Sequence, residues 1–170
     1  MTKKHEKIET NMKEKRKNSS FAEHSLDETD LKILKFLAAN ARASFREIAN
    51  SVGIAPATAI ERVRKLRDLG ILQGFTIKLN HEKLGYKLSV AIELVVRKGK
   101  LLEVERKIAH HPNVCAVYDI TGETDALIIA KFKDREELDA FVKSLLRIPL
   151  VERTNTHLIL NTVKEDFTLI

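Results

Sequence analysis

The spacing of apolar residues changes once along this chain, at Gly70, and this change constrains the fold more than any other feature. Before Gly70, apolar residues recur every three or four positions, as at Leu31, Leu34 and Leu37, which is the period of an amphipathic helix. After Gly70 they alternate, most clearly over residues 87–96, which is the period of a strand. We therefore expect an α+β fold in two parts, a helical N-terminal domain followed by a domain that contains a sheet.

Capping and stop residues predict three helices in residues 26–70. A polar N-cap or a first-turn proline begins a helix, and a glycine that adopts the left-handed conformation ends one. Two of these helices are joined by a short turn with a glycine, so we expect a helix-turn-helix. The signals are, in chain order, the N-cap Asp27, the S-x-x-E capping box of Ser44 and Glu47, the stop at Gly53, the first-turn Pro56 and the stop at Gly70.

The remainder of the chain predicts a ferredoxin-like β-α-β-β-α-β domain over residues 87–163. A hinge strand and linker, residues 71–86, connect it to the helical domain, and residues 164–170 form a C-terminal tail. Because two helices cover only one face of four strands, we expect the other face to pack on a second subunit. The predicted elements are strands over 87–96, 114–120, 126–133 and 151–162, with helices after Leu101 and around Phe141, and Cys115 is predicted to be a core residue.

The net charge of +6 is concentrated at the front of the chain. Residues 1–25, read as a disordered basic arm, carry 7 Lys/Arg against 4 Asp/Glu; residues 26–70 carry 8 against 6, and residues 71–170 carry 15 against 14. A basic front predicts an anionic partner, of which nucleic acid is the usual one. The alternative is that the arm only increases solubility.

Several classes of function are excluded or disfavoured. The single Cys115 rules out an internal disulfide or a multi-thiolate metal cage. We find no phosphate-binding or nucleophile motif, and expect no metal, no cofactor and no catalytic residue. No apolar run approaches the roughly 18 residues of a membrane span, so a soluble cytosolic protein without a membrane partner is expected.

The third helix has the chemistry of a DNA-reading helix. Its outward side carries cationic side chains that can neutralise phosphates and reach guanine edges. The alternative is a solvated helix whose charges are used in the i,i+4 pairs Glu61–Lys65 and Arg64–Asp68. The candidate DNA-binding residues are Arg46, Pro56, Ala57, Thr58, Ile60, Glu61, Arg62, Arg64, Lys65 and Arg67.

Five motifs occur in order along the chain: Leu26-Asp-Glu-Thr-Asp-Leu-Lys-Ile-Leu, Ser44–Gly53, Pro56-Ala-Thr, Glu61-Arg-Val-Arg-Lys-Leu and Gly70-Ile-Leu-Gln-Gly-Phe-Thr. Together they resemble the Lrp/AsnC family of feast/famine transcription regulators, and the resemblance covers about residues 26–163. The resemblance implies a winged-helix-like helix-turn-helix joined to a ferredoxin-like domain. It implies a regulator, not an enzyme, that binds double-stranded DNA as a homodimer assembling to a tetramer or octamer, and that lies in the cytoplasm on the nucleoid. Ala55 departs from the Ser or Thr usual at the N-cap of the recognition helix.

The segment Thr121–Asp125 has two interpretations. From its residues alone it is a tight hairpin turn, in which Gly122 supplies a positive φ and Asp125 bonds local amides. The family resemblance implies instead that it lines an effector site between dimers, where amides and hydroxyls hold the α-carboxylate of an amino acid and Asp125 its ammonium. The candidate effector residues are Thr121, Gly122, Glu123, Thr124, Asp125, Thr154 and Thr156.

Two rival functions stay open at the level of sequence. Siroheme decarboxylases resemble the same two-domain architecture and use it for porphyrin chemistry. An architectural protein would bind DNA with little sequence preference.

Overall fold

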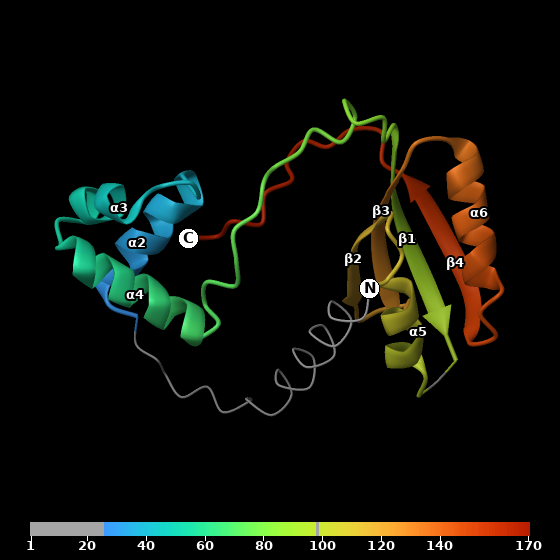
Figure 1. The fold of residues 1–170 in the computed structure, drawn as a ribbon. Coiled ribbons are helices and arrows are strands. Elements are labelled where there is room, and N and C mark those ends of the chain that lie inside the picture. The colour runs from blue at the N-terminus through green and yellow to red at the C-terminus, as the bar shows by residue number, and fades with distance from the viewer. Residues whose placement is uncertain (1–25, 98) are drawn as a thin grey trace. The chain divides into compact units, whose positions relative to one another are not determined.

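The computed structural model describes residues 26–97 and 99–170, so the predicted arm over residues 1–25 lies outside the described residues. Contacts divide these residues into two units (Figure 1). The first consists of residues 26–76 together with Phe167–Ile170, and the second of Ile77–Asp166. The chain therefore passes from the first unit to the second and returns to the first with its last four residues.

In residues 26–76 three helices pack around one apolar cluster. They are α2 (Glu28–Ala39), α3 (Phe45–Val52) and α4 (Pro56–Asp68). The predicted cap at Asp27 is confirmed, since its side chain accepts the Asp30 amide at 2.8 Å. The buried side chains of the cluster are Ile33, Leu37, Ile48, Ala49, Ala59, Val63 and Leu66.

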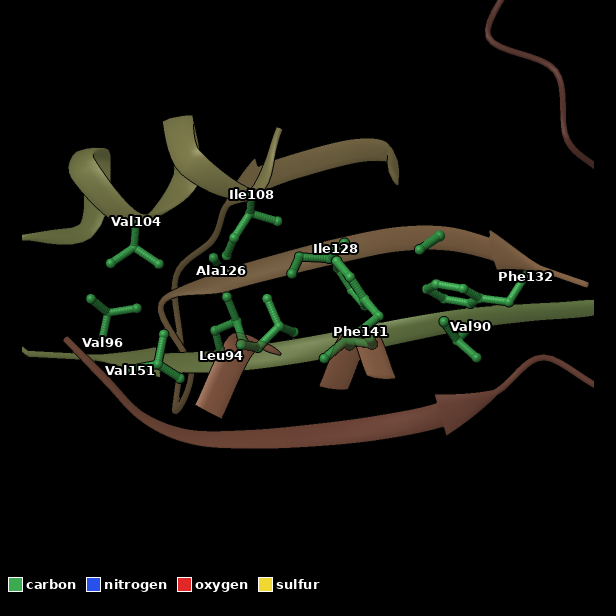
Figure 2. Close-up of a cluster of buried hydrophobic side chains, with 13 residues drawn as sticks. Val90, Leu94, Val96, Val104, Ile108, Ala126, Ile128, Phe132, Phe141 and Val151 are labelled. Atoms are coloured by element: carbon green, nitrogen blue, oxygen red, sulfur yellow. The ribbon is translucent and has the colours of Figure 1, made fainter. Parts of the chain in front are cut away.

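The second unit confirms the ferredoxin-like order of elements. Its four strands form one antiparallel sheet in the order β2-β3-β1-β4, and Figure 2 shows side chains of the sheet and of both helices meeting in a single apolar layer. In β1 and β3 alternate residues enter this layer, as the alternation of the sequence predicted. The elements are β1 (Leu88–Val96), α5 (Leu101–Ile108), β2 (Val114–Asp119), β3 (Ala126–Phe132), α6 (Arg135–Leu146) and β4 (Val151–Leu158).

The expected hinge strand is not formed in the described structure. Residues 71–80 have no strand assignment, although their apolar residues alternate as predicted. A strand needs a hydrogen-bonded neighbour, and none of the four strands of the sheet pairs with this segment. Its apolar side chains are consequently exposed, with Phe75 51% and Ile77 73% accessible. The described part of the first unit also has no wing, so the helix-turn-helix consists of helices alone.

Cys115 is exposed rather than buried in the core. The pairing of β2 with β3 shifts register between Val114 and Ala116, so Cys115 lies at an irregularity where strict alternation does not hold. Partial desolvation of the thiol nevertheless raises its pKa; Lys131 opposes this rise and Glu165 adds to it, both to a smaller extent.

The last residues of the chain complete the first unit. Phe167–Ile170 line a shallow hollow of about 410 Å³ with residues of α2 and of the segment after α4. Just before the return, Glu165 pairs with Lys131 of β3 at 3.2 Å, and the Lys131 side chain is only 11% exposed.

Candidate nucleic-acid interface and effector site

The helix-turn-helix is fixed by local hydrogen bonds at the start of α3 and in the turn. The predicted capping box is confirmed, because the Glu47 carboxylate accepts from the Ser44 amide at 2.7 Å and Ser44 Oγ accepts from the Glu47 amide at 3.3 Å. These bonds from Ser44, backbone first, lower the pKa of Glu47. Gly53 adopts φ 78° at the end of α3, and its amide and that of Ile54 both donate to the Ala49 carbonyl.

Helix α4 follows with a weaker start. Its N-cap, Ala55, forms no side-chain cap, and Pro56 occupies the first turn, where an amide would have no partner. The start of α4 is therefore held by the turn and by packing rather than by its own cap.

Most predicted DNA-binding side chains are exposed on this motif. Arg46 lies on α3, and the others lie along α4, with Thr58 half-buried. Within the described residues, no ion pair involves Arg46, Arg64 or Arg67, and the expected i,i+4 pairs of α4 are not formed. The exposed candidates are Arg46, Pro56, Ala57, Ile60, Glu61, Arg64, Lys65 and Arg67.

Arg62 differs from these residues, because it joins α4 to the start of α2. Its Nη1 lies 2.8 Å from Asp30 Oδ1 and also pairs with Asp27. Asp30 is fully buried, and Lys65 Nζ approaches its other oxygen at 3.6 Å. The Arg62 hydrogen bond is the main cause of the lowered pKa of Asp27. Arg62 is therefore occupied inside the helical unit, and sequence reasoning missed both of its partners.

The hairpin between β2 and β3 is closed by Asp125. Its amide donates to the Leu94 carbonyl at 2.8 Å, its carbonyl accepts from Ile120 at 3.0 Å, and its Oδ2 accepts from the Val96 amide at 2.7 Å. Val96 lies where the β1–β4 register shifts, so Asp125 ties the hairpin to this irregularity. Gly122 has φ 133°. These are the features of the turn interpretation.

Beside this hairpin is a hollow of about 570 Å³ between the hairpin, β1 and β4. Four of the predicted effector residues line it: Thr121, Glu123, Thr124 and Thr154. The other three, Gly122, Asp125 and Thr156, are not among its lining residues. Thr156 pairs with Ile92, two residues along β1 from Leu94, which pairs with Thr154 and contacts the hairpin. Sequence reasoning missed the remaining lining residues, which are Glu93, Ile120, Arg153 and Asn155.

The hollow brings charges of both signs together. Glu93 Oε2 accepts from Asn155 Nδ2 at 3.2 Å and contacts His157 Nε2 at 3.4 Å. No ion pair within residues 26–97 and 99–170 involves Arg153. The alternation of β4 could have indicated that Arg153 and Asn155 share a face. Nothing in the sequence places them beside Glu93, some 60 positions away.

Neither a metal site nor a membrane span is found in the part of the chain that the structure describes. No cluster of three or more His, Cys, Asp or Glu side chains is placed to hold a metal ion there. In the same residues, no helix has the length and apolar character needed to cross a bilayer.

Two family descriptions match the two parts of this architecture. Residues 26–67 match the AsnC-type helix-turn-helix domain, and residues 89–169 match the Lrp/AsnC ligand binding domain. The fold and the site thus define a transcriptional regulator that joins a DNA-binding helix-turn-helix to a ligand-binding domain. The chain belongs to the Lrp/AsnC family, as the sequence motifs predicted.

Named relatives support this assignment over most of the chain. An uncharacterized HTH-type transcriptional regulator of Pyrococcus furiosus is 49% identical over 144 residues, which are 85% of this chain and 97% of the relative. The HTH-type transcriptional regulator Ptr1 of Methanocaldococcus jannaschii is 36% identical over 82% of this chain and 95% of the relative. The crystal structure of a transcriptional regulator from Neisseria meningitidis in complex with L-Met has a TM-score of 0.79 and 30% identity, over 86% of this chain and 97% of that one.

Proposed function

We propose that this regulator recognises specific DNA sequences through the exposed side of α4, and that an amino acid bound in the hollow beside the Thr121–Asp125 hairpin modulates this binding. The observation that carries the DNA part is the contrast between Arg62 and Arg64. Arg62 is held by two carboxylates at the start of α2, whereas Arg64 is exposed and forms no ion pair with the residues that the structure describes. Cations with no partner in the described fold favour a partner outside it.

Arg64, Arg67 and Arg46 are the cations that we assign to DNA. A guanidinium can pair with the O6 and N7 atoms of guanine or with phosphate oxygens. Lys65 contributes by neutralising a phosphate, since its side chain is 53% exposed despite its neighbour Asp30. We do not assign Arg62 to DNA, because it pairs with Asp27 and Asp30.

Fluorescence polarisation on promoter DNA and on scrambled DNA tests the interface. Arg64→Ala should weaken promoter binding and reduce the preference over scrambled DNA, whereas Lys65→Ala should weaken both about equally. For each phosphate that a variant no longer neutralises, the slope of log K against log salt should become shallower by about 0.9. Arg106→Ala, which removes one exposed charge from α5, is the matched control. Unchanged affinity in an Arg64→Ala/Arg67→Ala double variant would refute the assignment, and equal affinity for both DNAs would favour the architectural alternative.

The effector part rests on the chemistry of the hollow and on the L-Met complex of the Neisseria relative. Threonine hydroxyls, a guanidinium and carboxylates surround the hollow, and these groups suit a zwitterion. Calorimetry of the full chain against the twenty amino acids is the test, followed by DNA titration at saturating ligand. A coupling of about 1–3 kcal/mol, or roughly 5–150-fold in DNA affinity, is typical. If no amino acid binds at millimolar concentration, the effector proposal fails and the DNA proposal stands.

We infer that the sheet face opposite α5 and α6 packs on a second copy of the chain. Leu127 and Ile129 of β3 point away from the buried layer and are only half-buried, and Tyr118 of β2 is 41% exposed. Ile129→Glu should convert the dimer to a monomer in light scattering. Retention of the dimer would contradict this interface. The proposal that dimers assemble to tetramers or octamers rests on the family resemblance. The mass of the wild-type chain in the same light-scattering measurement tests it.

Porphyrin binding distinguishes a regulator from the siroheme-decarboxylase-like enzyme that is the alternative. A siroheme-decarboxylase-like protein would bind porphyrin, so an absorption titration with an iron porphyrin should show no saturable Soret shift. A protein that acts on genomic DNA should be found with the nucleoid in the cytoplasm, which imaging of a fluorescent fusion tests.

A further inference from the structure

The charges that line the effector hollow are unequal in number. Glu93 and Glu123 supply two carboxylates, and Arg153 supplies one guanidinium; the other lining side chains are uncharged. At neutral pH the lining therefore carries a net charge of about −1 by the ordinary ionisation of these groups. This imbalance bears on which class of amino acid the site accepts.

Register places the three charges in different positions around the hollow. Arg153 pairs with Val95 and Asn155 with Glu93, so Arg153 and Glu93 are diagonal neighbours across β4 and β1. Diagonal neighbours lie about 7–8 Å apart at the backbone, which leaves room for a small group between their side-chain ends. Glu123 comes from the hairpin instead of the sheet, and so approaches from another side.

The charged side chains Glu93, Glu123 and Arg153 are not fully paired with other residues of the described structure. Both polar contacts of the Glu93 carboxylate, from Asn155 and His157, fall on Oε2. Glu93 Oε1 makes no such contact among the described residues. Among residues 26–97 and 99–170, Arg153 and Glu123 enter no ion pair.

Building on the proposed effector function, we propose that this hollow selects an amino acid with a cationic side chain, such as lysine, ornithine or arginine. Arg153 pairs with the α-carboxylate, Glu93 with the α-ammonium, and Glu123 with the side-chain cation. Such a ligand carries +1 and neutralises the lining. A neutral amino acid leaves Glu123 without a partner, and an acidic one places a second carboxylate against it. The volume of about 570 Å³ lies within the range of small-molecule sites.

Calorimetry of the full chain with L-lysine, L-ornithine, L-methionine, L-leucine and L-glutamate tests the selectivity. Lysine and ornithine should bind roughly fivefold tighter than methionine, the upper end for a solvent-accessible charge pair, with glutamate weakest. L-Lysinamide, which lacks the carboxylate, should bind weakly because it offers Arg153 no anion to pair with. Raising the salt concentration should narrow the preference for lysine.

Variants assign the selectivity to single residues. Glu123→Gln should reduce the lysine-to-methionine ratio to near one while methionine still binds, and Arg153→Gln should weaken every amino acid. Glu152→Gln is the matched control, because Glu152 adjoins Arg153 on β4 but does not line the hollow. Thermal melts confirm that each variant folds.

The outcomes separate this inference from the function on which it rests. If methionine or leucine binds as tightly as lysine, or if Glu123→Gln leaves the ratio unchanged, the charge selectivity is wrong and the amino-acid effector stands. If no amino acid binds the wild-type chain, both fail.

Discussion

Replacing Arg62 by methionine should destabilise the helical unit without removing a DNA contact. The change keeps an unbranched, largely apolar side chain and deletes the guanidinium and its charge. It leaves the Asp30 carboxylate, which is fully buried, with Lys65 Nζ at 3.6 Å as its nearest cation in the described structure. The same change deletes the ion pair of Arg62 with Asp27.

The size of the effect follows from the burial of each partner. Breaking a buried ion pair by removing one partner costs about 3–5 kcal/mol, because the other charge stays buried and uncompensated. We take the low end, about 3 kcal/mol, since the Arg62 side chain is 28% exposed and Lys65 can move closer to Asp30. That corresponds to roughly a 100-fold loss in the folding equilibrium of the unit.

Urea unfolding followed by circular dichroism at 222 nm measures this loss, and polarisation on promoter DNA measures affinity at a temperature where the variant is folded. Arg64→Met is the control, with the same charge removed from the same helix. Arg62→Met should lower stability and spare affinity, whereas Arg64→Met should do the reverse. Adding Asp30→Asn to Arg62→Met should restore part of the stability, because the stranded charge is gone. Unchanged stability in Arg62→Met, or a loss of affinity as large as that of Arg64→Met, would refute this reasoning.

Three further changes have expected outcomes. Asp125→Ala should lower the unfolding free energy of the sheet unit by about 1–2 kcal/mol, because the Val96 amide loses its 2.7 Å acceptor; an unchanged urea midpoint would contradict this. Burial raises the pKa of Glu105, with a smaller contribution from Asp119, so the ionisation of this carboxyl opposes folding above its unfolded-state pKa. Glu105→Gln should therefore raise the urea midpoint at pH 7 but not below about pH 4. The pKa values of Asp27 and Glu47 are lowered in the folded state, so their ionised carboxylates stabilise the helices above the unfolded-state pKa values. This stability should be lost as the pH falls through the folded-state pKa values. A helical circular-dichroism signal that stays constant from pH 6 to pH 2 would contradict this.

Features set by residues close in sequence were predictable. The Ser44–Glu47 capping box is an example, because its two partners are three positions apart on one helix start. The alternation of β1 likewise reports the burial of one face of a strand, and the structure confirms it. The element order of both units follows from such local signals.

Features set by distant residues were not predictable. Arg62 has the same sequence context as Arg64, and only the packing of α4 on α2 brings it to Asp27 and Asp30, more than 30 positions away. For the same reason only half of the residues that line the hollow were predicted, since Glu93 and Arg153 are brought together only by the pairing of β1 with β4. The segment after Gly70 shows the converse, because its alternation predicts a strand but cannot supply the neighbour that a strand requires.

The return of Phe167–Ile170 to the first unit has a consequence for synthesis. The three helices of that unit precede the second unit in the sequence, whereas the four residues that line its hollow beside α2 follow it. A contiguous fragment cannot contain the whole first unit without also containing the second. A chain that stopped within the second unit would therefore carry α4 but lack these four residues of its DNA-binding unit.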